Sequence, residues 1–295
     1  FWLKSGLAFS FSRGSRRMGI GGKSGRGRRL SPEEDAKRYR EGYPGLVDEP
    51  DVWDNLKFYQ GEIPSRSMDK KWPEDYIDTI HSEWRGKYDM LERHHSWVQW
   101  LFPIREQGVN RDSQPLTCAE REAILDDAQC KERLSLSYEL ALDFYGFVLA
   151  NRETGDLERT AKWEAQFANL NKKTHNFLRL TRILKWLGEF GLQHYQAPLV
   201  RALAKGVFES PFLLWDMRTS LMQYFVPVVK DDAARAELEA EVAEMDAAAE
   251  TAWSGGGGSR RVTRGGGTVR PRDSAGGREP AQQKQRWQRE AWGAW

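Results

Sequence analysis

Aromatic side chains are concentrated between residues 84 and 102, and their spacing could serve binding. Trp97 and Trp100 are three positions apart, so both rings lie on one face if this segment is helical. With Asp89 before them and Arg105 after them, they would form a surface that grips a peptide, because an acid pairs with an amine and an arginine with a carboxylate. These four residues are our candidate ligand-binding residues. The alternative is that the rings fill the core, since tryptophan buries much apolar area.

A second candidate site consists of basic residues. Arg179, Arg182 and Lys185 recur every three positions and form a partly separate basic face of an expected helix. This helix and the next one flank Gly191, which gives the outline of a helix-turn-helix motif. The three cations are therefore candidate phosphate contacts to nucleic acid. Few side chains of the following helix could contact bases, and any helical bundle contains such corners, so nucleic acid stays an open alternative.

Signs of catalysis are missing from the sequence. It contains no motif of a nucleotide-binding enzyme, serine hydrolase, zinc protease or calcium-binding loop. His94 and His95 are adjacent, so on a helix their rings point about 100° apart, whereas two metal ligands need a spacing of three or four. Cys118 and Cys130 form neither a CxxC pair nor a disulfide framework. We predict a protein that is not an enzyme, with no metal and no cofactor.

Helical periodicity dominates the elements that must position these residues. Leu134, Tyr138, Ala141, Tyr145 and Val148 follow one another at intervals of three or four. Other apolar residues occupy most of the remaining faces, which is typical of a buried helix. We therefore predict a central core helix over residues 129–150.

The remaining pattern predicts an all-α fold, a compact multi-helix bundle. Trp72 and Pro73 indicate one helix start, and a capping-box spacing of Thr117 and Glu120 indicates another. Residues 56–59 are the only candidate strand. Besides the central helix, we expect helices over residues 72–86, 88–101, 117 onward, 174–188, 196–208, 213–226 and 231–251.

Charge and glycine divide the 295 residues into unlike parts, although the formal net charge is only +2. Residues 1–50 have 11 Lys/Arg and 6 Asp/Glu, and residues 254–295 have 9 and 3, whereas residues 51–253 have 25 and 34. We expect disordered basic, Gly-rich arms over residues 1–37 and 254–295, since such segments bury too little apolar surface to fold. Residues 231–253 form an acidic Ala/Glu-rich helix with a thin apolar stripe of Leu238, Val242 and Met245, and residues 38–230 form the main domain.

The sequence does not fit the classes of membrane-spanning or secreted proteins. No run of residues approaches the 18 or so apolar positions of a membrane span, and the N-terminus lacks the order of charges and apolar residues of a signal peptide. The two cysteines suit the reducing cytosol or nucleus. The start at Phe1-Trp2 suggests a fragment.

Several blocks in one order resemble the N-terminal domain of the opioid growth factor receptor family, over about residues 38–230. The blocks are residues 95–106 (HSWVQWLFPIRE), 114–117 (QPLT), 138–146 (YELALDFYG), 167–171 (FANLN) and 181–200 (TRILKWLGEFGLQHYQAPLV). The resemblance implies an all-α, non-GPCR receptor of an opioid pentapeptide, met-enkephalin, that acts in growth regulation. It also implies residence in the nucleus and cytoplasm with association to the perinuclear membrane.

The sequence also departs from this family. After Val229 comes the acidic helix instead of basic and aromatic residues, and the C-terminal peptide repeats of some members are absent. The resemblance supplies no ligand-contacting residues. The expected partners are the pentapeptide and, through the basic arms, the nuclear import machinery. The alternative function is a nuclear scaffold or nucleic-acid-binding helical protein with no peptide ligand.

Overall fold

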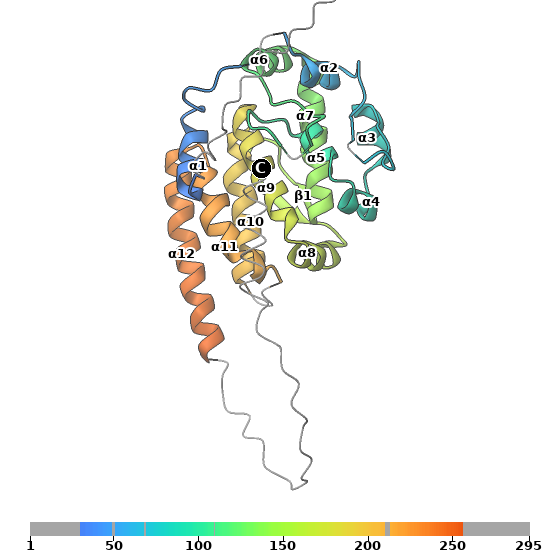
Figure 1. The fold of residues 1–295 in the computed structure, drawn as a ribbon. Coiled ribbons are helices and arrows are strands. Elements are labelled where there is room, and N and C mark those ends of the chain that lie inside the picture. The colour runs from blue at the N-terminus through green and yellow to red at the C-terminus, as the bar shows by residue number, and fades with distance from the viewer. Residues whose placement is uncertain (1–29, 49–50, 68, 109, 210–212, 256–295) are drawn as a thin grey trace, which may run out of the picture.

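The structure, a computed structural model, describes residues 30–48, 51–67, 69–108, 110–209 and 213–255. Helices dominate this part of the chain, which confirms the predicted all-α class (Figure 1). The α-helices are α1 (Pro32–Arg40), α2 (Asp54–Gln60), α3 (Ile77–Glu83), α4 (Tyr88–Arg93), α5 (Trp97–Leu101), α6 (Cys118–Asp126), α7 (Ala128–Tyr145), α8 (Trp163–Lys172), α9 (His175–Glu189), α10 (Gln196–Phe208), α11 (Arg218–Ser220) and α12 (Asp232–Gly255). Single turns of 3-10 or π helix are η1 (Gln193–Tyr195), η2 (Trp215–Met217), η3 (Leu221–Phe225) and η4 (Val226–Val228).

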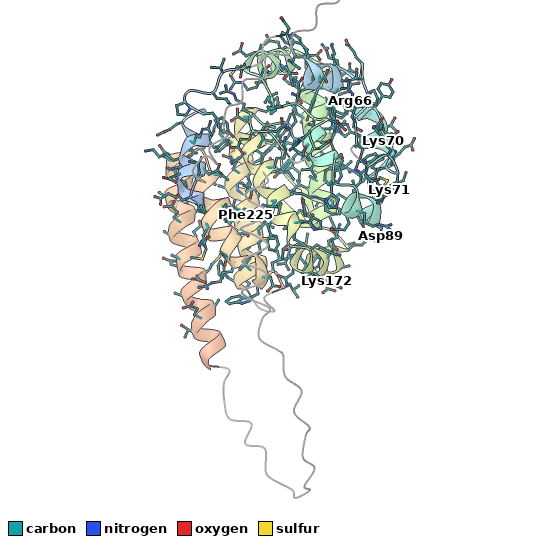
Figure 2. The ribbon with its side chains drawn as sticks, viewed as in Figure 1. Arg66, Lys70, Lys71, Asp89, Lys172 and Phe225 are labelled. Atoms are coloured by element: carbon teal, nitrogen blue, oxygen red, sulfur yellow. The ribbon has the colours of Figure 1, made fainter. Side chains whose placement is uncertain are left out.

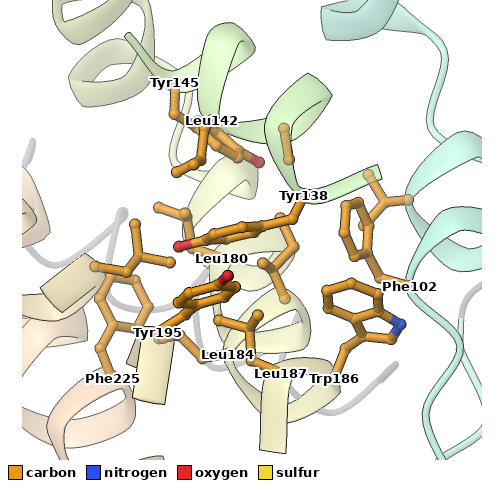
Figure 3. Packing of buried hydrophobic residues seen from close by; sticks show 14 of the residues in the cluster. Phe102, Tyr138, Leu142, Tyr145, Leu180, Leu184, Trp186, Leu187, Tyr195 and Phe225 are labelled. Carbon is orange, nitrogen blue, oxygen red and sulfur yellow. The ribbon is translucent and has the colours of Figure 1, made fainter. Parts of the chain in front are cut away.

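Helix α9 lies in the middle of the molecule and is buried on every face from Asn176 to Glu189. Leu180, Leu184 and Leu187 face the rings of α7 and η1 (Figure 3). Tyr138 of α7 and Tyr195 of η1 stack there, with ring centroids 5.3 Å apart. The predicted range of 174–188 matches this helix closely, because its apolar stripe follows the 3.6-residue period.

Helix α7 is shorter than the predicted range of 129–150. The carboxylate of Asp127 caps its start by accepting hydrogen bonds from the amides of Gln129 and Cys130. Its end is at Gly146, whose φ of 91° is the left-handed conformation that terminates helices. The chain then forms an antiparallel hairpin of β1 (Phe147–Leu149) and β2 (Leu157–Arg159), the only sheet among the described residues.

Two other sequence-based boundaries need correction, and one is confirmed. Residues 56–59, the candidate strand, belong to α2. The helix expected over residues 72–86 begins only at Ile77, as α3, and the helix expected over residues 88–101 is divided into α4 and α5, whereas the expected break at Gly86 is present. Thr117 does form the predicted capping box. Its hydroxyl accepts a hydrogen bond from the backbone amide of Glu120, and the carboxylate of Glu120 accepts one from the backbone amide of Thr117.

Helix α12 packs along α10 at one edge of the bundle and extends beyond it (Figure 1). Leu238 and Val242 of the expected apolar stripe are buried, and Met245 is partly buried against the core. Arg201 of α10 binds both carboxylate oxygens of Glu241, with distances of 2.7 and 2.9 Å. The acidic helix is therefore part of the folded body, held by apolar contacts and ion pairs.

Helix α1 joins the first described residues to the last third of the bundle. Ala36 and Tyr39 are buried, and Arg40 donates a hydrogen bond to the carbonyl of Pro227 in η4. Residues 32–37 thus belong to the folded body, which corrects the predicted arm of 1–37. Residues 1–29 of that arm and residues 256–295 lie outside the described residues.

Among the described residues, no helix combines the length and the apolar character that crossing a bilayer requires.

Candidate functional site

A pocket of about 450 Å³ opens between α4, the end of α7 and the first turns of α8, and we call it the α4–α8 pocket. Figure 2 shows Asp89 on this side of the molecule, near Lys172 at the end of α8. The lining side chains are aromatic, small apolar, amide and charged: Tyr88, Asp89, Glu92, Phe144, Ala161, Lys162, Glu164, Ala165, Gln166 and Asn169.

Two aromatic rings form fixed walls of this pocket. Phe144 is buried and packs edge-on against Trp97 and Tyr145, at centroid distances of 5.9 and 4.9 Å. The hydroxyl of Tyr88 donates to Asp143 Oδ1 at 3.2 Å, and burial together with the nearby Asp143 raises the pKa of Tyr88. Both rings are held from behind by these contacts, so these two walls of the pocket are in place without a ligand.

Three carboxylates and one ammonium group face the pocket, from Asp89, Glu92, Glu164 and Lys162. Glu92 is the most constrained of them, because Oε2 accepts hydrogen bonds from the amides of Asn169 at 2.6 Å and Asn176 at 3.0 Å. An excess of negative charge in a partly enclosed pocket favours a cationic ligand.

Histidines extend this polar cluster toward the interior. His175 Nε2 lies 2.6 Å from Glu92 Oε1. Burial would raise the pKa of Glu92, but the close contact with His175 and the hydrogen bonds from Asn169 and Asn176 outweigh it and lower the pKa to about 2. His95 lies beside His175, and burial followed by the charge of Arg179 lowers its pKa to about 4.

The adjacent His94 and His95 diverge, as their spacing predicts. The ring of His94 packs between Trp72 and Trp84, whereas His95 turns toward Arg179. Among the described residues, no group of three or more His, Cys, Asp or Glu side chains is arranged to hold a metal ion.

The two tryptophans predicted to contact ligand are packing residues. Trp97 and Trp100 have no exposed surface. Trp97 packs against Phe144, and its Nε1 donates to the carbonyl of Leu91 at 2.9 Å. Trp100 Nε1 donates to the carbonyl of Arg66 at 2.8 Å. The prediction of an aromatic binding surface is therefore wrong. The helix face that Trp97 and Trp100 share is turned into the core, and the indole nitrogens of both rings donate hydrogen bonds there.

The expected basic face is also buried. Arg179 donates to the carbonyls of Leu91 and Glu92, at 3.1 and 3.2 Å, at the end of α4. Arg182 Nε donates to the carbonyl of Phe102 at 2.7 Å. The two guanidinium groups thus satisfy backbone oxygens at the ends of short helices, which buried carbonyls require.

Lys185, the third residue of the expected basic face, is buried as well. Its ammonium group lies 2.8 Å from Asp35 Oδ2 and 2.7 Å from Glu106 Oε1, and its side chain is only 3% exposed. None of the three cations is therefore available to phosphates, so the candidate nucleic-acid contacts Arg179, Arg182 and Lys185 are structural residues.

Arg105 lies apart from the α4–α8 pocket, at a smaller cavity of about 220 Å³. It donates to the carbonyl of Gly42 and to Asp48 Oδ1, both at 3.0 Å, and so holds the chain after α1. Of the four predicted ligand residues, only Asp89 lines the larger pocket. The places of Tyr88, Lys162 and the amides of Gln166 and Asn169 in this pocket do not follow from the sequence, because their approach depends on the packing of α8 against α4 and α7.

The comparisons with known proteins concern this same region. The family model described as the opioid growth factor receptor (OGFr) conserved region matches residues 48–256. The opioid growth factor receptors of Rattus norvegicus and Homo sapiens are 44% identical over 210 residues and 43% identical over 206 residues, covering 70% and 69% of this chain. Opioid growth factor receptor-like protein 1 of Mus musculus is 36% identical over 209 residues, or 69% of this chain.

The matched part corresponds to 35%, 30% and 43% of these three relatives, so the chain spans a minority of their length. No solved structure matches the chain. The matched residues include α2 to α12 and with them the whole α4–α8 pocket. By this match over most of its length, the chain belongs to the opioid growth factor receptor family.

Proposed function

We propose that this protein is a receptor-type, non-enzymatic member of its family that binds the opioid growth factor peptide met-enkephalin and acts in growth regulation. The relatives are named receptors for an opioid growth factor, which supports a peptide ligand. The observation that carries the proposal is the α4–α8 pocket, in which Tyr88 and Phe144 provide aromatic walls beside the carboxylates of Asp89 and Glu92.

The pocket suits part of such a ligand. Its volume of about 450 Å³ lies in the usual range of small-molecule sites and takes one end of a pentapeptide with its first side chain. Fixed aromatic walls limit the entropy lost on binding, because few protein groups must be ordered by the ligand. The remainder of the peptide would lie along the exposed surface of α4 and α8.

Calorimetric titration of the full chain with met-enkephalin tests this proposal. The variant A165W places an indole in the pocket and should abolish saturable heat at micromolar peptide. A243W, on the exposed surface of α12, is the matched control and should bind as the wild type does. Absence of saturable heat from the wild type, or equal binding by A165W, would overturn the proposal.

The alternative function is nuclear scaffolding or nucleic-acid binding through the basic arms. The same arms bear on where in the cell the protein lies. Residues 1–29 contain Arg13, Arg16, Arg17, Lys23, Arg26, Arg28 and Arg29 among glycines, a composition suited to nuclear import or phosphate contact. We also propose that the protein occupies the nucleus and cytoplasm and associates with the perinuclear membrane, as the family resemblance implies. Replacing those arginines with glutamine should shift a fluorescent fusion to the cytoplasm and remove salt-dependent nucleic-acid binding, and an unchanged distribution would count against import through this arm.

A further inference from the structure

Glu92 is held as a rigid anion at the wall of the α4–α8 pocket. Its side chain is only 12% exposed, and three side chains from α8 and α9 lie against it: two of them hydrogen-bond to Oε2, while Oε1 is buried without a hydrogen-bond partner among the described residues. Asn169 and Asn176 donate to Oε2, and His175 lies 2.6 Å from Oε1. A carboxylate fixed in this way binds a ligand cation without the cost of ordering a mobile side chain. Asp89 is exposed on the outer turn of α4 and has no such support.

A second carboxylate, that of the partly buried Asp143, adds negative charge behind the same wall. Asp143 accepts from the hydroxyl of Tyr88 through Oδ1, while its Oδ2 is buried and makes no hydrogen bond with the described residues. Arg179, the guanidinium beside the cluster, is directed to the carbonyls of Leu91 and Glu92 and not to either carboxylate. A buried, unpaired carboxylate oxygen is costly, and an incoming cation would reduce that cost.

Apolar groups lie next to these anions. The rings of Tyr88 and Phe144 and the methyl groups of Ala161 and Ala165 line the pocket together with Glu92. The ammonium of Lys162 lies 5.8 Å from the centroid of the Tyr88 ring, so a cation of the protein already lies over this ring and a ligand cation is directed to the carboxylates. The lining therefore suits a ligand in which a positive charge is directly attached to an apolar or aromatic group.

We infer that the α4–α8 pocket selects a primary ammonium group next to an apolar or aromatic side chain, and that Glu92 is the anion that binds it. This specificity rests on the proposed peptide-binding function and extends it. It assigns the free N-terminus of the peptide to the pocket and makes Glu92, in place of the exposed Asp89, the specificity-determining residue.

The test compares met-enkephalin with its N-acetylated form, which keeps the side chains but removes the charge. Calorimetry on the full chain should show that acetylation weakens binding by at least about 30-fold, the usual effect of removing one partner of a buried ion pair. E92Q should weaken binding of the free peptide by a similar factor and should lose most of the discrimination between the two peptides. E158Q, which removes an exposed carboxylate on β2, is the control and should behave as the wild type does.

The outcomes separate this inference from the function on which it rests. Equal binding of both peptides by the wild type would overturn the ammonium specificity while peptide binding stands. Normal discrimination by folded E92Q would overturn the role of Glu92. If circular dichroism shows that E92Q does not fold, the acetylated peptide still decides the specificity, and D143N should reduce discrimination in the same direction. Binding of neither peptide by the wild type would overturn both proposals.

Discussion

The hydroxyl of Tyr39 donates a hydrogen bond of 2.9 Å to the carbonyl of Lys185, and this contact ties α1 to the buried helix α9. Gly188 follows one turn later on α9 and faces the same hydroxyl. The close approach of α1 therefore requires a residue without a side chain at position 188, in the last turn of α9.

Replacing Gly188 with alanine should destabilise the protein. The added methyl group would overlap Tyr39 Oη and lie 2.9 Å from Lys230 Cδ. Overpacking of this kind costs about 1–3 kcal/mol, which urea denaturation of G188A should show as a lower midpoint. Y39F removes the overlapping oxygen, so Y39F/G188A should lose less stability than the sum of the two single variants. A fully additive pair would contradict the contact.

Removing the charge of Lys185 should be more damaging. K185M leaves Asp35 and Glu106 without the buried ammonium that lies within 2.8 Å of both, and breaking a buried ion pair costs about 3–5 kcal/mol. K173M, at an exposed position just before α9, should change the unfolding free energy by less than about 0.5 kcal/mol. Similar, small effects of both variants would show that Lys185 is solvated after all.

Histidine burial predicts sensitivity to weak acid. Burial lowers the pKa of His81, whose Nε2 lies 2.9 Å from Ser137 Oγ, to about 4. The unfolded chain binds a proton near pH 6.5, whereas the folded protein does not. Stability should therefore fall as the pH decreases from about 6.5 to 4, by up to about 1.4 kcal/mol per pH unit for this group.

Urea unfolding as a function of pH checks this sign. H81Q should flatten the slope between pH 6.5 and 4, while H194Q, at an exposed position on η1, controls for the loss of an imidazole. An unchanged slope in H81Q would assign the acid sensitivity to other groups.

The attachment of α12 gives another prediction. Arg218 binds both oxygens of Asp246, at 2.5 and 2.6 Å, and also reaches Glu250 at 2.7 Å. R218M should lower stability by about 1–2 kcal/mol and speed hydrogen exchange in α12, since charge-assisted bidentate bonds are among the stronger polar contacts. R85M, whose contact with Glu139 is 3.5 Å long and exposed, should have little effect. Unchanged exchange in R218M would show that apolar packing alone holds α12.

The sequence was most informative where local pattern alone decides the structure. The bounds of α9 and α10 and the cap at Thr117 follow from periodicity and capping chemistry, and the structure has them within about one residue. The end of α7 was missed because Phe147 and Leu149 continue its apolar character, so the left-handed Gly146 was not recognised as the stop.

The site was less predictable, because residue spacing shows which side chains share a helix face but not whether that face is turned to the core or to solvent. Trp97 and Trp100 do share a face, but only tertiary packing turns it inward. The cations of α9 bond with carbonyls and carboxylates that are 79 to 150 positions away, so nothing local distinguishes them from a solvated basic face. Glu92 gains its role from Asn169 and Asn176 in the same manner.

The hydrogen bond from Arg40 to the carbonyl of Pro227 spans 187 positions of the chain. At ordinary translation rates a ribosome needs roughly 10–40 s to synthesise that many residues. The partner of Tyr39 in α9, the carbonyl of Lys185, is itself synthesised 146 positions after Tyr39, so the buried side of α1 acquires its native contacts only late in this interval. Folding of this domain is therefore completed late in synthesis, and a nascent chain that ends before η4 lacks the contact between α1 and Pro227.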